Sequence, residues 1–128
     1  MIIIDTSAII AIALAEPGFE KISHRLFAEA ERFISPMSIV EATMVLSRCT
    51  SNPKTVVDEN IKRAGIAVCP VDETQAEYAQ QAFLTYGKGR HSARLNLGDC
   101  FSYAAAKALD AALLYVGSDF SNTDIKAA

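Results

Sequence analysis

Four acidic residues occupy positions where the sequence predicts the end of a strand or the first turns of a helix. Asp5 follows the apolar run at the start of the chain, and Asp119 follows another apolar run near its end. Glu41 lies one turn into a helix after a second predicted strand, and Asp99 lies in the first turn of another helix. Because the carboxyl ends of parallel strands meet at one edge of a sheet, we expect the four carboxylates to lie close together.

Carboxylates gathered in this way repel one another, so their charge needs compensation. Divalent metal ions supply it, and an all-oxygen ligand set selects Mg²⁺ or Mn²⁺ over zinc. The chain has only two histidines, His24 and His91, and neither pairs with a cysteine at ligand spacing. Taken singly, each acid also has an ordinary interpretation as a helix-end, capping-box or turn residue. Their common placement at one edge of the sheet favours a metal site over these separate interpretations.

The elements that must position these acids alternate between short apolar strands and amphipathic helices. Strands are predicted over 1–4, 33–35, 66–70 and 112–116, with a further edge strand around Ile125; helices are predicted over 6–15, 19–32, 38–49, 54–64, 72–86 and 98–109. Ser38 and Glu41 have capping-box spacing, as does the stretch that begins at Asp72. The alternation predicts an α/β fold with a short parallel sheet of four to five strands flanked by helices, in a single domain over residues 1–128.

Composition limits the classes of protein that remain. The 128 residues are 51% hydrophobic with a net charge of −3, which is typical of a globular chain rather than a disordered one. No apolar run is long enough to span a membrane, and the apolar start lacks the basic region of a signal peptide. Three cysteines without CxxC spacing predict free thiols and a cytoplasmic protein. One basic segment stands out, because Lys88, Arg90 and Arg94 occur in a window without acids.

Several nucleotide- and ester-processing classes are excluded by missing motifs. The chain has no GxxxxGK[ST] phosphate loop and no GxSxG nucleophile elbow. A receiver domain would have an acid pair after the first strand and a lysine after the last, whereas this chain has only Asp5 and then Asp119. A haloacid-dehalogenase-type phosphatase would have Asp-x-Asp where this chain has Asp5-Thr6-Ser7.

The chain resembles PIN-domain nucleases, and more closely the VapC-type toxins of bacterial toxin–antitoxin pairs. The matching stretches are IIIDTSAIIAIALAEP, SPMSIVEATMVL, YGKGRHSARLNLGDCFSYAAAKAL and VGSDFSNTDI, which occur in the family's order and extend from residue 2 to residue 125. The resemblance implies a three-layer PIN-like fold and an endoribonuclease that uses Mg²⁺ or Mn²⁺ to activate water. Two other functions remain open: a housekeeping RNA-processing nuclease without an antitoxin, and a non-catalytic PIN-like binding module.

The resemblance also implies roles for particular residues. The catalytic and metal-binding acids of the family match Asp5, Glu41, Asp99 and Asp119, and Asp124 matches a further acid that is a candidate metal ligand. Thr6, Ser7 and Ser118 are secondary candidates; many relatives have an acid where this chain has Ser118. The chemistry needs no side-chain nucleophile, so it is not expected to depend on Cys100.

The implied partners are an RNA substrate, a cognate VapB-like antitoxin and a second copy of the chain in a homodimer. Lys88, Arg90 and Arg94 precede Asp99 closely enough to contact RNA phosphates beside the cut, which would position RNA independently of its sequence. Apolar residues of the first helix (Ile9, Ile10, Ile12 and Leu14) and of the helix that bears Met44, Val45 and Leu46 are the predicted antitoxin-binding surface.

Overall fold

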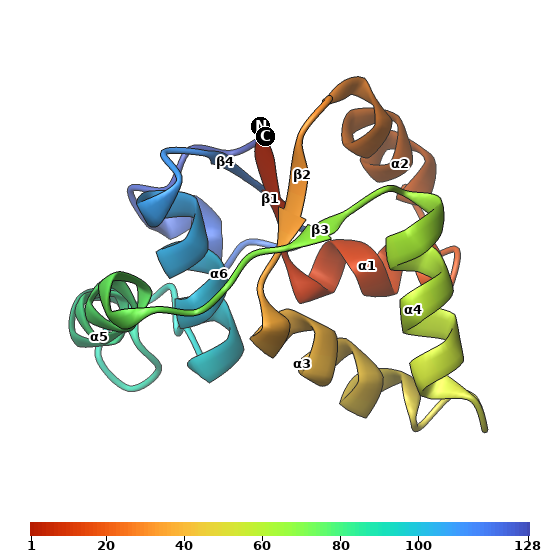
Figure 1. Cartoon of the computed structure of the whole chain (residues 1–128). Coiled ribbons are helices and arrows are strands. Elements are labelled where there is room, and N and C mark those ends of the chain that lie inside the picture. The colour runs from red at the N-terminus through yellow and green to blue at the C-terminus, as the bar shows by residue number, and fades with distance from the viewer.

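The structure, a computed structural model, describes residues 1–128 and has a parallel sheet between two groups of helices (Figure 1). The elements follow in the order β1 (Ile2–Ile4), α1 (Thr6–Ala13), α2 (Phe19–Ala28), β2 (Arg32–Ile34), α3 (Pro36–Leu46), α4 (Pro53–Arg63), β3 (Ala67–Val68), α5 (Glu73–Tyr86), α6 (Leu97–Ala108), β4 (Ala112–Leu114) and the 3₁₀ turn η1 (Phe120–Asn122). This confirms the predicted α/β fold with four parallel strands. No helix is long and apolar enough to cross a membrane.

The sheet has the order β3-β2-β1-β4, so β1 lies between two neighbours. Ile3 pairs with Phe33 of β2 on one side and with Leu113 of β4 on the other, and all pairings are parallel. The three isoleucines of β1 have no exposed surface. A run of β-branched residues without polar alternation suits such a strand, because both of its faces are covered by helices.

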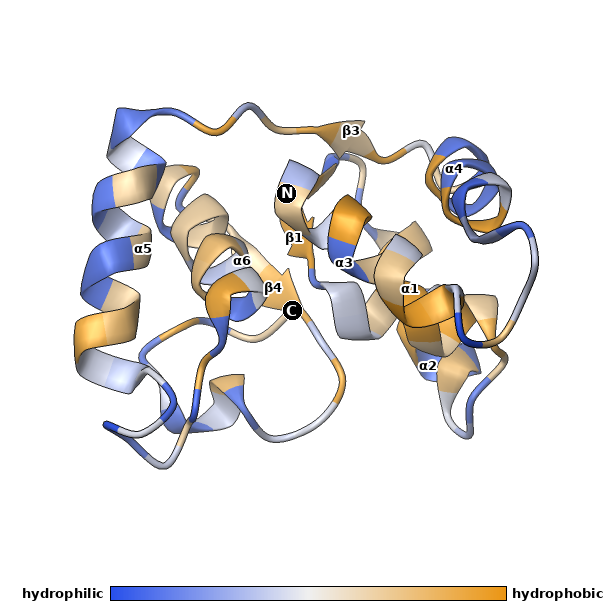
Figure 2. Cartoon of the chain, turned by 90° about the horizontal axis from the view of Figure 1, so that it is seen from below, coloured by the Kyte–Doolittle hydropathy of each residue, from blue (hydrophilic) through white to orange (hydrophobic).

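Two hydrophobic cores lie on the two faces of the sheet. Ile3 and Leu113 belong to the core beneath α5 and α6, whereas Ile2, Ile4 and Leu114 belong to the core beneath α1–α4. Neighbouring strand residues point to opposite faces, and this alternation assigns each to its core. Figure 2 shows hydrophobic β1 and β4 between the two groups of helices, with hydrophilic residues on the outer turns of α4 and α5.

Several predicted boundaries were wrong. The second helix ends at Ala28 rather than at residue 32, and the third strand has only two residues. The predicted edge strand near Ile125 is instead a single parallel bridge between Leu113 and Ala127. Ser38 is not a helix cap: Ser35 is the N-cap of α3 and accepts a hydrogen bond from the Met37 backbone N–H at 3.3 Å. Pro36, which favours the first helical position, starts the helix there and turns Ser38 into the interior.

Candidate active site

An acidic cleft of about 310 Å³ opens at the carboxyl ends of β1 and β4. Its lining brings together all four predicted catalytic acids and two of the three secondary candidates; its residues are Asp5, Thr6, Ser7, Ile10, Glu16, Glu41, Val45, Asp99, Val116, Asp119 and Phe120. The parallel sheet delivers Asp5 directly, and α3, α6 and the segment after β4 deliver the other acids. No lysine, arginine or histidine lines the cleft.

Asp5 is held tightly at the end of β1. Its Oδ2 accepts hydrogen bonds from the backbone N–H and the hydroxyl of Ser7, at 2.9 and 2.6 Å. Its Oδ1 accepts a hydrogen bond from the hydroxyl of Ser102 on α6 at 2.7 Å. Ser7 in turn accepts from the backbone N–H of Val116 at 2.9 Å, which ties the segment after β4 to the same carboxylate. Asp5 is 3% exposed, so these hydroxyls replace water as its donors.

Asp99 is both a helix-capping residue and a member of the cleft. Asn96 is the N-cap of α6, its side chain accepts from the Asp99 backbone N–H, and Asp99 Oδ2 accepts from the Asn96 backbone N–H at 2.9 Å. Burial raises the pKa of Asp99 to about 7; the Asn96 hydrogen bond opposes this, and the nearby charges of Asp5, Glu41 and Asp119 add to it. The carboxyl therefore lies where ionisation is costly without a neutralising cation.

Glu41 reaches the cleft from α3 and lies against the first turn of α6. A β-carbon added at Gly98 would lie only 2.1 Å from Glu41 Oε2. The glycine therefore leaves the space that the Glu41 carboxylate occupies. Asp119 lies at the exposed rim, directly before η1, and its side chain makes no capping hydrogen bond. Its carboxylate is thus free of the intramolecular bonds that fix Asp5 and Asp99.

Sequence reasoning missed Glu16 as a fifth acid of this cleft. Glu16 follows α1, where Ala15 has a left-handed φ of 48° and the Glu16 backbone N–H bonds to the Ala11 carbonyl oxygen at 2.9 Å. This tight turn folds Glu16 back toward the cleft, and no motif in the sequence signals it. The Asn96 cap was also missed, although Asn96-x-x-Asp99 has capping-box spacing and could have been found.

The donor chemistry of the cleft fits a divalent cation. Five carboxylates face one cavity without a basic side chain, and all the ionisable groups there are hard oxygen ligands of the kind that Mg²⁺ and Mn²⁺ prefer. Burial is the main reason that the pKa of Asp99 is raised, and the charges of Asp5, Glu41 and Asp119 raise it further. No group of three or more His, Cys, Asp and Glu side chains has the arrangement of a formed metal site. The acids therefore share a cavity without converging on one point.

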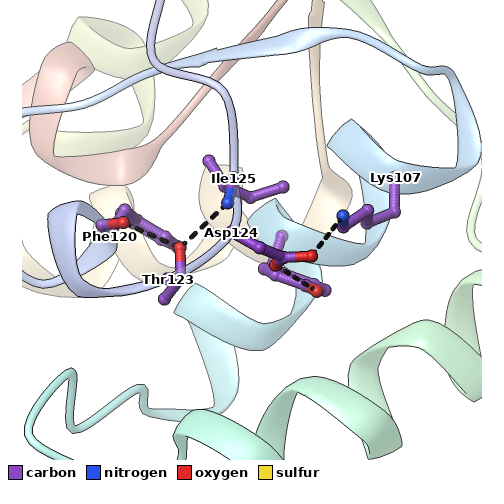
Figure 3. Close-up of polar contacts among 6 residues, drawn as sticks. Lys107, Phe120, Thr123, Asp124 and Ile125 are labelled. Carbon is purple, nitrogen blue, oxygen red and sulfur yellow. Dashed lines mark hydrogen bonds and ion pairs between the residues drawn. The ribbon is translucent and has the colours of Figure 1, made fainter.

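Asp124 does not line the cleft. Its Oδ1 accepts from the Tyr103 hydroxyl at 2.8 Å and its Oδ2 pairs with Lys107 Nζ at 2.7 Å, so it joins the C-terminal tail to α6 (Figure 3). Burial acts to raise its pKa, but the hydrogen bonds from Lys107 and Tyr103 hold the pKa below the ordinary aspartate value. Both oxygens are thus engaged in an anchor for the segment after η1.

The remaining predicted residues lie outside the cleft. Ser118 is exposed, and its carbonyl oxygen accepts from the Ser121 hydroxyl. Lys88, Arg90 and Arg94 are exposed on the loop before α6, and none belongs to an ion pair. Arg90 lies over the Phe83 ring at 5.2 Å. The two ends of the loop are nevertheless joined, because buried Leu95 donates its backbone N–H to the Tyr86 carbonyl oxygen and accepts from the Lys88 backbone N–H, both at 3.0 Å.

A larger, mostly apolar groove of about 680 Å³ separates α5 from the start of α6. It contains Cys100, which is 3% exposed. Burial, followed by the charge of Asp99, raises the pKa of the Cys100 thiol to about 11. A thiol that stays protonated at neutral pH is a poor nucleophile, so Cys100 is poorly suited to nucleophilic chemistry.

Comparison with known proteins matches the whole length of this fold. A family model described as the PIN domain matches residues 2–126. The chain is 40% identical over 124 residues to the VapC ribonuclease Mb0640 of Mycobacterium bovis, covering 96% of this chain and 95% of that protein. It is also 40% identical over 126 residues to the ribonuclease VapC of Mycolicibacterium smegmatis, covering 98% of each.

Solved structures show the same fold at low sequence identity. The Mycobacterium tuberculosis toxin VapC20, described as cleaving the sarcin–ricin loop, superposes with a TM-score of 0.75 at 17% identity, covering 100% of this chain and 98% of that one. FitAcB from Neisseria gonorrhoeae superposes with a TM-score of 0.67 at 21% identity, covering 99% of this chain and 96% of that one.

Proposed function

The chain belongs to the PIN-domain family, and from that premise we propose that it is a VapC-type toxin, an endoribonuclease that uses Mg²⁺ or Mn²⁺. The observation that carries the proposal is the single cleft that five carboxylates line without a basic side chain. Identity of 40% to curated VapC ribonucleases over nearly the full chain favours a toxin ribonuclease over a housekeeping nuclease without an antitoxin. A non-catalytic module would have no need for two buried carboxyl groups, Asp5 and Asp99, that face a cavity.

Each acid has a distinct part in this proposal. Asp5 and Asp99 are buried and fixed by hydrogen bonds, so they are the ligands whose geometry is set before a cation arrives. Glu41, half-buried, and Asp119, at the rim, complete the ligand set. When bound, the cation offsets phosphate charge and lowers the pKa of water, which supplies the nucleophile. Asp124, bonded to Tyr103 and Lys107, is left out of this set.

The acidic cleft repels the phosphates of RNA, so binding the strand there requires cationic side chains nearby. Lys88, Arg90 and Arg94 carry unpaired charge on the loop that leads into α6, so we assign the phosphates flanking the cut to them. The contact would hold the strand beside Asp99 without reading its bases. The same RNA substrate favours the cytoplasm as the place of action, as do the three free cysteines.

We assign the VapB-like antitoxin to a groove of about 400 Å³ between α1, α2 and α4. Ile9, Ile12 and Phe27 line it, and Phe27 is 55% exposed. One face of α1 lines this groove while Ile10 lines the acidic cleft, so a segment seated there would end close to the site. The antitoxin-binding surface predicted from the sequence combined the first helix with α3, whereas this groove combines the first helix with α2 and α4.

A homodimer would cover Val40, Met44 and Leu97, which are 58%, 66% and 67% exposed.

The test is cleavage of single-stranded RNA by the purified chain in Mg²⁺ or Mn²⁺. We expect cleavage that stops with EDTA and survives thiol alkylation. Asp5→Asn and Asp99→Asn should lose the activity while staying folded. Asp58→Asn is the matched control, because Asp58 is an exposed acid on α4 that pairs only with Lys54. Full cleavage by Asp99→Asn, or in EDTA, would refute the proposed chemistry.

A further inference from the structure

Two serines without any exposed surface lie beneath Asp5. Ser38 comes from α3 and Ser102 from α6, and their hydroxyl oxygens are 3.1 Å apart. Ser102 also donates to Asp5 Oδ1 at 2.7 Å. Neither serine lines the acidic cleft, and neither caps a helix. A buried hydroxyl is costly unless it is paired, so this pair needs an explanation.

The direction of the hydrogen bonds that link Ser38, Ser102 and Asp5 follows from counting protons. A carboxylate can only accept, so the one hydroxyl proton of Ser102 goes to Asp5. Ser102 can then take part in the 3.1 Å contact only as acceptor, and Ser38 must donate to it. The result is a one-way chain from Ser38 through Ser102 to Asp5 Oδ1. Such a chain polarises its members and strengthens the last bond.

The same counting assigns the oxygen of Asp5 that faces a cation. Each carboxylate oxygen has two lone pairs. Ser7 uses both on Oδ2, through its backbone N–H and its hydroxyl. Ser102 uses one on Oδ1, which leaves one lone pair free. Asp5 is therefore set up to bind a cation through Oδ1 alone.

We infer that Ser102, supported by Ser38, is a positioning residue that fixes Asp5 for one-oxygen binding of the catalytic cation; this rests on the proposed metal-dependent function. Ser102→Ala leaves Oδ1 with no partner and lets the carboxylate turn. Outer hydrogen bonds to metal ligands commonly contribute 10–100-fold to metal affinity. Ser38→Ala leaves the bond to Asp5 in place and removes only its polarisation, so its effect must be smaller.

The experiment measures Mn²⁺ affinity of the purified chain without RNA, by calorimetry, beside the Mg²⁺ dependence of RNA cleavage. We expect Ser102→Ala to weaken Mn²⁺ binding about tenfold or more, and Ser38→Ala by a smaller factor. The half-saturating Mg²⁺ concentration should rise while kcat at saturating Mg²⁺ recovers to near the wild-type value. In an Asp5→Asn background, Ser102→Ala should change Mn²⁺ affinity no further. Ser35→Ala is the control, because Ser35 is equally buried and does not contact Asp5.

The outcomes separate two failures. A wild-type chain that binds no Mn²⁺ and cleaves no RNA would overturn the proposed function and this inference with it. A wild-type chain that binds Mn²⁺, with Ser102→Ala binding it equally well, would overturn the inference alone. If Ser102→Ala does not fold, Ser38→Ala decides, since an affinity identical to wild type would refute the chain of hydroxyls.

Discussion

The carboxylate of Glu41 occupies the space that a β-carbon at Gly98 would fill. The closest approach, to Oε2, would be 2.1 Å, and the Glu41 Cδ would lie 2.7 Å away. These distances are far below van der Waals contact, so any other residue at position 98 must displace the carboxylate. Gly98 directly precedes Asp99. The position of the Glu41 carboxylate therefore depends on the residue next to a second acid of the cleft.

Gly98→Ala should therefore separate stability from activity. Alanine is favoured over glycine inside a helix by up to about 1 kcal/mol, so α6 should not lose stability. The Glu41 carboxylate would move, and we expect RNA cleavage to fall about tenfold or more. Urea unfolding and cleavage rates measure the two effects. In a Glu41→Gln background the same change should add little; an additional loss of similar size there would mean that Gly98 acts elsewhere.

Asp99→Asn should stabilise the metal-free protein at neutral and alkaline pH. Burial raises the folded pKa of Asp99 from 3.8 to about 7, so the folded protein keeps a proton that the unfolded chain has released. Wild-type stability therefore falls as the pH rises from about 4 to about 7 because of this group. The variant lacks that loss, and we expect a gain on the order of 1–3 kcal/mol at pH 8. Urea unfolding in EDTA at several pH values measures it. An equal difference at pH 4 and pH 8 would contradict the assigned cause.

Replacing Lys88, Arg90 and Arg94 together by alanine should weaken RNA binding while leaving Mn²⁺ affinity unchanged. Each lost phosphate contact removes roughly 0.7 from the slope of log affinity against log salt, so the slope should fall by about 2. Binding is measured over a salt series in an Asp99→Asn background, which prevents cleavage. The charge-matched control replaces Lys54, Lys62 and Arg63 of α4. An unchanged affinity and slope would show that the loop does not bind RNA phosphates and instead contacts a protein partner or only solvent.

Asp124→Ala should lower stability without lowering Mn²⁺ affinity. It removes an ion pair to Lys107 and a hydrogen bond from Tyr103, and because Asp124 is 53% exposed we expect a loss of only about 0.5–1.5 kcal/mol. The folded pKa is lowered, so this contribution is present near neutral pH and disappears as the pH falls through the folded pKa. Unfolding at pH 7 and pH 3, beside Mn²⁺ calorimetry, tests both points. A loss of Mn²⁺ affinity as large as that of Asp99→Asn would return Asp124 to the ligand set.

The placement of the acids was predictable because it follows from a topological rule. Asp5 follows a strand that any parallel arrangement would bury, and Asp99 lies in the first turn of a helix that returns to the same edge. Their capping roles are compatible with their place in the cleft: Asp5 caps α1 and Asp99 completes a capping box while both face the cavity.

The contacts that hold the acids in place were not predictable from the sequence. Ser102 and Asp5 are 97 residues apart in sequence, and nothing local distinguishes Ser102 from an exposed helical serine. Ser35 and Ser38 are both plausible caps, and only Pro36 at the first helical position decides between them. Glu16 depends on a left-handed turn at Ala15, a residue type that rarely adopts it.

The pairing of β1 with β4 has a consequence for synthesis of the chain on the ribosome. Ile3 and Leu113 are neighbours in the sheet although nearly the whole chain separates them, and Asp5 meets Asp119 only once both strands are in place. Contacts of such long range form late, because loop closure precedes any gain from them. A nascent chain that has emerged only as far as α5 carries Asp5, Glu16 and Glu41 but neither Asp99 nor Asp119. It therefore lacks two of the five acids that line the cleft, and the acidic site is completed only when the last part of the fold is added.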